Sequence, residues 1–174
     1  MKILVPTDFS PCASNALDAA CKLGQKLGAE IHLYNSADLP EEWEDLPVED
    51  KVKDSVNRAL ALQTKAKLLA EVEKIDKYNL KSQLHYTGGK FLKNIEEVIQ
   101  ENKFDLIVMG SKGAKGKHEW FIGSNAQKVI RNIHLNTLIV KNPIENVNFS
   151  KVVFASNLSS NDKVSLHRFL EFIK

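Results

Sequence analysis

The chain has 174 residues, a formal net charge of +2 and a hydrophobic share of 43%. These values suit one globular domain with a small appendage. The small net charge argues against nucleic-acid binding, and no stretch is long and apolar enough to cross a membrane. There is no signal-peptide pattern at the start, so we expect a soluble cytoplasmic protein. Cys12 and Cys21 lie about 13.5 Å apart along one predicted helix, which excludes a disulfide between them.

The chain opens with a predicted buried strand at residues 2–7, and Asp8 follows it directly. Ser10 as N-cap and Pro11 at the first helical position predict a helix that starts here and ends at Gly28. Asp8 therefore sits at the carboxyl end of a strand, the edge where open parallel sheets bind ligands. We expect Asp8 to contact a ligand, and the alternative is that it only supports the turn.

Residues 29–36 predict a second strand, in which His32 is expected to be packed or solvated rather than bound to metal. Residues 38–50 carry seven acids and two prolines, which predict a surface loop. Residues 51–78 predict the longest helix. Its sheet-facing row is expected to be Val52, Val56, Ala59, Leu62, Ala66, Leu69, Val72 and Ile75. A third strand is predicted at 80–86, a turn at 87–89 and a helix from Phe91 to Ile99.

Residues 104–125 predict a buried strand, a glycine-rich loop and the start of a helix with Ser124 as its N-cap. Gly110, Gly113 and Gly123 let a ligand approach the backbone, and Lys112, Lys115 and Lys117 add positive charge. Exposed N–H groups and the helix dipole at such a turn favour an anion, and a phosphate chain is the simplest one. The alternative is an ordinary strand-to-helix turn. Neither G-x-x-x-x-G-K-[ST] nor G-x-G-x-x-G is present, which argues against a P-loop or a standard dinucleotide fold.

A last strand is predicted at 136–141, which completes the order βαβαβαβαβ. Alternation at this spacing predicts an open, mostly parallel five-stranded sheet with helices on both faces. The last strand is apolar and is expected at a sheet edge, where it would pair with a second copy or a second domain.

Residues 151–174 repeat the opening of the chain at a constant offset, with Asn157 in the place of Asp8. We interpret 143–150 as a linker and 151–174 as the strand and helix that start a second, incomplete repeat. One strand and one helix cannot bury a core alone, so they are expected to dock on another surface.

On these residues the chain resembles the universal stress protein family, over residues 1–142. Gly110, Gly113, Gly123 and Ser124 match the family's G-x2-G-x9-G-[ST] motif, and residues 6–10 match its opening turn. The resemblance implies a Rossmann-like fold of the adenine nucleotide alpha hydrolase-like kind, and a member of the ATP-binding branch. It also implies a homodimer through the last strand, and many members are tandem repeats.

The resemblance further assigns residues to the nucleotide. Pro6, Thr7 and Asp8 would meet the base and ribose, Ser36 marks the strand end beside adenine, and Met109 and Gly110 would line the ribose. Gly113, Gly123, Ser124 and Asn125 would hold phosphates of ATP, ADP or AMP, bridged by Mg²⁺ or Mn²⁺.

Three functions remain open from the sequence. The first is an ATP-binding regulator or sensor in the stress response, with slow hydrolysis at most. The second is a slow ATPase on the same scaffold, and the third is an interaction module that no longer binds nucleotide.

Overall fold

The computed structural model describes residues 1–111, 122–156 and 160–172. Its strands form one parallel sheet in the order β3-β2-β1-β4-β5, which confirms the predicted fold. β1 lies at the centre, where Ile3 is opposite both Ile31 and Leu106. The strands are β1 (Lys2–Pro6), β2 (Glu30–Ala37), β3 (Ser82–Gly88), β4 (Leu106–Gly110) and β5 (Thr137–Val140). β5 is an edge strand, as predicted.

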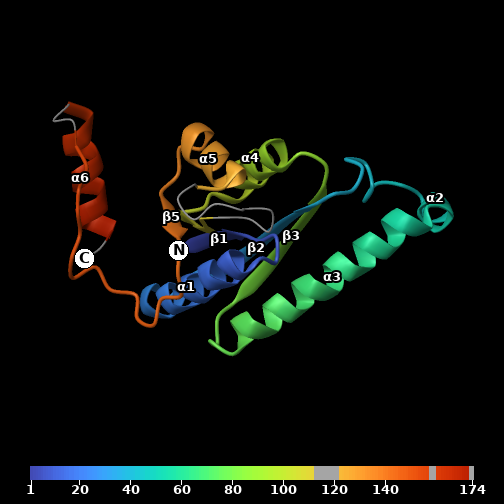
Figure 1. Cartoon of the computed structure of the whole chain (residues 1–174), viewed down its shortest axis with the longest axis horizontal. Coiled ribbons are helices and arrows are strands. Elements are labelled where there is room, and N and C mark those ends of the chain that lie inside the picture. The colour runs from blue at the N-terminus through green and yellow to red at the C-terminus, as the bar shows by residue number, and fades with distance from the viewer. Residues whose placement is uncertain (112–121, 157–159, 173–174) are drawn as a thin grey trace.

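Helices cover both faces of the sheet (Figure 1). On one face, α1 (Pro11–Leu27) and α3 (Ser55–Asp76) share a core with the strands, and α4 (Phe91–Asn102) and α5 (Ser124–Asn132) do so on the other. Small buried residues such as Ala16 and Ala20 let α1 lie close to the sheet. None of the helices within the described ranges is both long and apolar enough to span a bilayer.

The start of α1 follows the sequence prediction. The Ser10 side chain accepts a hydrogen bond from the Ala13 N–H at 3.2 Å, and Pro11 occupies the first turn. The helix ends at Gly28, whose φ of 62° is the left-handed conformation that glycine adopts without strain. Capping at both ends fixes where α1 begins relative to β1, and so fixes the turn that carries Asp8.

The single helix predicted at 51–78 is wrong, because two helices occupy this region. α2 (Val48–Lys53) ends at Asp54, whose carboxylate accepts a hydrogen bond from the Asn57 N–H at 3.0 Å and caps α3. Most of the predicted sheet-facing row is also wrong, since Val56, Leu62 and Leu69 are more than half exposed, although Ile75 at its end is buried as expected. The side chains that α3 buries are Ala61, Thr64, Leu68, Glu71 and Ile75.

The acidic stretch after β2 is anchored to the protein rather than being a purely solvated loop. Leu39 and Trp43 are buried in a small core of their own, where they pack with Ala37 and Ala61. The Gly89 N–H donates to the Leu39 carbonyl at 2.9 Å, so the backbone of the stretch lies against the end of β3. These contacts fix the acidic stretch beside the start of α4.

Residues 143–150 lie beside the C-terminal end of α1 (Figure 1). Val147 is buried, and Ile144 and Phe149 pack against the same core. Lys22 Nζ donates to the Ile144 carbonyl at 2.6 Å, and Lys26 Nζ donates to the Val147 carbonyl. The linker is therefore part of the packed body.

The strand predicted after residue 150 does not form, because no neighbouring strand lies beside residues 151–156 within the described structure. Val153 is 97% exposed. The predicted helix is present as α6 (Ser160–Phe172), which stands apart from the sheet in Figure 1. The Phe149 and Phe169 rings meet edge to face with centroids 6.3 Å apart, and this contact links α6 to the linker.

His32 is packed, in agreement with the sequence prediction, against a second histidine. Its Nδ1 lies 2.9 Å from Nε2 of His85 on β3, and the two rings are stacked. The Phe104 ring meets His32 edge-on at 4.9 Å. Burial lowers the pKa of His32, although Glu30 opposes this shift. Burial, the neighbouring His32 and Lys2 lower the pKa of His85.

We expect the melting temperature to fall as the pH drops below about 6.5. Because the pKa values of the folded pair are lowered, the unfolded chain binds more protons than the folded protein in that range. Acid therefore favours unfolding, and the lost stability returns above that pH. His85→Gln should roughly halve the slope of unfolding free energy against pH between pH 5.5 and 7, because one of two titrating groups is removed. His134→Gln, at an exposed histidine, is the control. An unchanged slope in His85→Gln would contradict this account.

Candidate functional site

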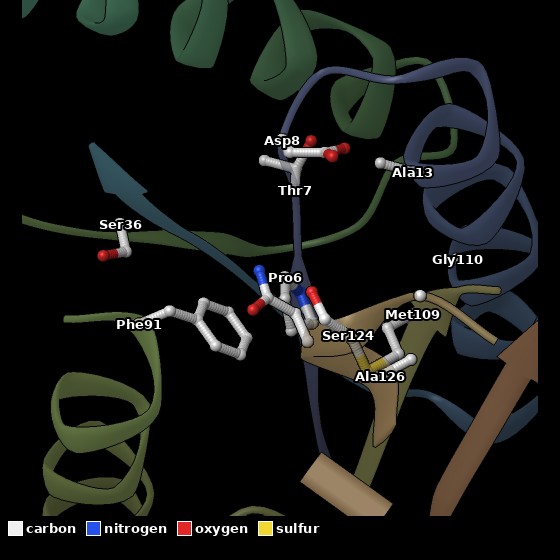
Figure 2. A pocket seen from close by; sticks show the side chains of 12 residues that line it. Pro6, Thr7, Asp8, Ala13, Ser36, Phe91, Met109, Gly110, Ser124 and Ala126 are labelled. Atoms are coloured by element: carbon white, nitrogen blue, oxygen red, sulfur yellow. The ribbon is translucent and has the colours of Figure 1, made fainter. Parts of the chain in front are cut away.

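A cavity opens at the carboxyl ends of the central strands (Figure 2). Its volume is about 130 Å³. Of the predicted binding residues, the cavity is lined by Pro6, Thr7, Asp8, Ser36, Met109, Gly110, Gly123, Ser124 and Asn125. Gly113 and the predicted lysines of its loop lie outside the described residues. The structure thus brings the opening turn and the glycine stretch to one hollow, and their part in binding stays a prediction.

The turn that carries Asp8 is held by hydrogen bonds to its neighbours. The Thr7 N–H donates to the Tyr34 carbonyl at 2.8 Å, and Asn35 Nδ2 donates to the Thr7 carbonyl at 2.8 Å. Asp8 Oδ1 accepts a hydrogen bond from the Ser10 N–H at 3.1 Å. Phe9, between them, has a φ of 62°, which is strained for a bulky residue and persists only where surrounding contacts enforce it.

Phe9 is held in this conformation from two directions. Its N–H donates to Thr7 Oγ1 at 3.0 Å, and its ring packs against the core with Lys67 Nζ 5.4 Å from the ring centre. This strain could not be predicted from residue type, because residues in the left-handed conformation are normally glycine or asparagine. The strained turn sets the direction in which the chain leaves Asp8.

Gly110 ends β4 where α1 begins. A Cβ on Gly110 would lie 2.7 Å from the carbonyl carbon of Cys12, closer than real side chains come to backbone. Only glycine therefore lets the start of α1 approach the end of β4 this closely. This is a different reason for glycine from the one predicted, which was the approach of a ligand to the backbone.

Two helices present uncapped N-termini to the cavity. α5 starts at Ser124 and α4 starts at Phe91, both in the cavity lining, and no described side chain caps either helix. The prediction of Ser124 as N-cap is wrong, because Gly123 takes that position and accepts the first helical hydrogen bond, from Gln127, at 2.9 Å. The unsatisfied N–H groups and the dipoles of both helices favour an anion here.

Three lining residues were not predicted from the sequence: Ala13, Phe91 and Ala126. They are apolar and belong to no chemical motif, so residue type alone could not mark them. Phe91 is the one whose position near the cavity had a signal in the sequence. It follows the Thr87-Gly88-Gly89 turn, which was predicted at the end of the third strand. With Pro6 and Met109 it gives the cavity an apolar wall, while Asp8 and Ser124 provide polar groups.

A larger hollow, with a volume of about 380 Å³, lies between α1 and α3. Two of its charged side chains, Asp18 and Lys74, have partners: Lys22 Nζ lies 2.7 Å from Asp18, the Tyr78 hydroxyl donates to Asp18, and Lys74 contacts Glu71 at 2.8 Å. Although burial opposes it, these hydrogen bonds from Lys22 and Tyr78 lower the pKa of Asp18. The cavity at the strand ends is smaller but has uncapped helix ends, so it is the better candidate for a charged ligand.

The family model of the universal stress protein family matches residues 1–141. The chain belongs to this family. It is 30% identical over 148 residues to universal stress protein MJ0531 of Methanocaldococcus jannaschii, covering 82% of each protein. Among solved structures, this universal stress protein is similar to the protein MJ0577. The TM-score is 0.69 and the sequence identity is 26%, over 82% of this chain and 96% of that one.

Two further family structures contain nucleotides. A universal stress protein in complex with cAMP has a TM-score of 0.62 and 23% identity, over 80% of this chain and 96% of that one. The protein from Archaeoglobus fulgidus in complex with dAMP has a TM-score of 0.59 and 20% identity, over 81% of this chain and 98% of that one. These two likenesses concern the fold. Within the described part of this chain, no cluster of three His, Cys, Asp or Glu side chains could hold a metal ion.

Proposed function

We propose that this universal stress protein binds an adenine nucleotide, ATP in the first instance, and acts as a cytoplasmic regulator or sensor in the stress response. One observation carries the proposal: the uncapped N-terminus of α5 opens onto the same cavity as Asp8. Helix N-termini favour phosphate, and a carboxylate is a common partner for ribose hydroxyls.

The residues present fit such a ligand. In the proposed arrangement Asp8, Pro6 and Thr7 meet the ribose and base, Met109 and Gly110 line the ribose, and Ser36 lies beside the base. Ser124 and Asn125 at the start of α5 hold phosphate together with Gly123. Mg²⁺ or Mn²⁺ would be held through the phosphate oxygens, since the described residues offer no protein site for it. The family structures with cAMP and dAMP support an adenine nucleotide as the ligand class.

Calorimetric titration with ATP and Mg²⁺ tests the proposal. The unmodified protein should release or absorb heat and melt at a higher temperature with ATP, because a ligand of the folded state stabilises it. Asp8→Ala should weaken binding about tenfold or more, as expected for a lost charged hydrogen bond. Asp38→Ala is the matched control, because Asp38 is exposed just after β2 and outside the cavity lining. No heat and no melting shift would favour an interaction module, and equal losses in both variants would contradict the role of Asp8.

Turnover separates a regulator from a slow ATPase on the same scaffold. A regulator should release phosphate no faster than the background. Steady release above background that disappears in Ser124→Ala would overturn the regulatory proposal.

We also propose that β5 pairs with a second copy or a second domain, and that residues 151–174 begin a second repeat. Support for the first comes from the position of β5 at the sheet edge. Support for the second comes from the repeated sequence and from the exposed Val152, Val153 and Phe154. Light scattering of the native protein tests the pairing, and a monomer with rapid amide exchange along β5 would contradict it.

A further inference from the structure

The apolar wall of the cavity contains one aromatic ring. Phe91, the first residue of α4, lines the cavity and extends toward Pro6 (Figure 2). Ser36 lies on one side of the ring, and Ser124 lies beyond Pro6. The ring is half-buried, so one part packs into the protein and another remains open to the cavity.

The ring is held in place before any ligand arrives. Its buried side packs against Tyr34, with ring centres 5.8 Å apart and planes tilted by 51°. Ser36 Oγ donates to the Gly89 carbonyl at 3.0 Å, and the Gly89 N–H donates to the Leu39 carbonyl at 2.9 Å. These bonds fix the backbone two residues before Phe91. A ligand that contacts the ring therefore does not have to order it first.

We propose that Phe91 stacks on the base of the bound nucleotide and sets the preference for ligands that carry a planar base over ribose phosphates that lack one. This inference rests on the proposed nucleotide binding. An aromatic ring offers a flat face that every base can cover, and such stacking strengthens binding about tenfold per base. The phosphate and ribose contacts lie on other residues, so they do not depend on this ring.

The test compares AMP with ribose 5-phosphate, which carries a hydroxyl group on C1 of the ribose in place of the base. Calorimetry should show that Phe91→Leu weakens AMP binding about tenfold and leaves ribose 5-phosphate binding unchanged. Phe91→Tyr keeps an aromatic face and should retain the AMP affinity. Phe91→Met, whose unbranched side chain is longer and fills irregular gaps, serves if the leucine variant does not fold, and should behave as leucine does.

A second measurement uses the unmodified protein. The ring protons of Phe91, assigned by their loss in Phe91→Leu or Phe91→Met, should shift in the NMR spectrum with AMP but not with ribose 5-phosphate, because a stacked base shields them.

Equal AMP affinity in Phe91→Leu and the unmodified protein would overturn the stacking role while leaving nucleotide binding intact. Equal weakening of both ligands would show that Phe91 supports the cavity only by packing, and would overturn it as well. If the unmodified protein binds neither ATP nor AMP, the proposed function fails and this inference fails with it.

Discussion

Replacing Gly88 by alanine is expected to lower the free energy of unfolding by about 3 kcal/mol, near the upper end for overpacking. Gly88 ends β3, and a Cβ there would lie 2.2 Å from the Pro40 carbonyl oxygen and 3.3 Å from that of Leu39. Both atoms belong to backbone that is anchored by the buried Leu39 and Trp43 side chains. The acidic stretch would have to move away from the sheet, because no flexible side chain is available to yield. Urea unfolding measures the loss.

Gly28→Ala is the control for the change of residue type. A Cβ at Gly28 meets nothing within 4 Å, but φ is +62°. The cost there should be about 1 kcal/mol, from the left-handed backbone alone. Equal costs at the two glycines would show that the acidic stretch yields easily and would contradict its anchored position.

Replacing Val147 by aspartate is expected to release residues 143–150 from α1. Val147 is 6% exposed, and burial of a valine side chain contributes about 1.5 kcal/mol or more. A carboxylate at this position would lose its hydration on burial. The nearby cations among the described residues are Lys22 and Lys26, which already donate to the carbonyls of Ile144 and Val147. The population with the linker detached should therefore rise at least about tenfold. Hydrogen exchange of the amides from 144 to 149 measures this release.

The matched control is Val153→Asp, because Val153 is 97% exposed and contributes little packing. It should leave exchange in the linker unchanged. The melting temperature should fall in Val147→Asp, because Val147 packs in the same core as α1 and the central strands, and should move little in Val153→Asp. Unchanged protection in Val147→Asp would show that the two lysine bonds alone hold the linker.

Local patterns predicted the framework correctly because they act through local physics. Pro11 and Ser10 specify a helix start, and unbroken apolar runs specify strands buried on both faces. A chain of alternating strands and helices can adopt few sheet topologies, so the parallel sheet could be predicted. Because parallel strands end at one edge, Asp8 and Gly110 were expected near each other, and the cavity contains both.

Other features depend on contacts that a pattern does not contain. α3 has two rows with three- and four-residue spacing, one through Leu62 and Leu69 and one through Ala61 and Leu68, and both can end at Ile75. Apolar spacing alone could not choose between them. The buried row also contains Glu71, whose polarity argued against it. The strand expected after residue 150 needs a neighbour to pair with, and the described chain provides none. Leu39 and Trp43, four apart within an acidic stretch, were the available signal for its anchoring.

The central position of β1 has a consequence for synthesis on the ribosome. Ile3 emerges among the first residues, yet it must wait for Leu106 before its second neighbour exists. At cellular elongation rates this delay is roughly 5 to 20 s. During that time the apolar strand has one open flank, which is a target for chaperones and for neighbouring nascent chains. Slow translation of the codons before residue 106 would lengthen the time during which β1 lacks its second neighbour. Codon usage in this part of the messenger RNA should therefore affect the yield of folded protein.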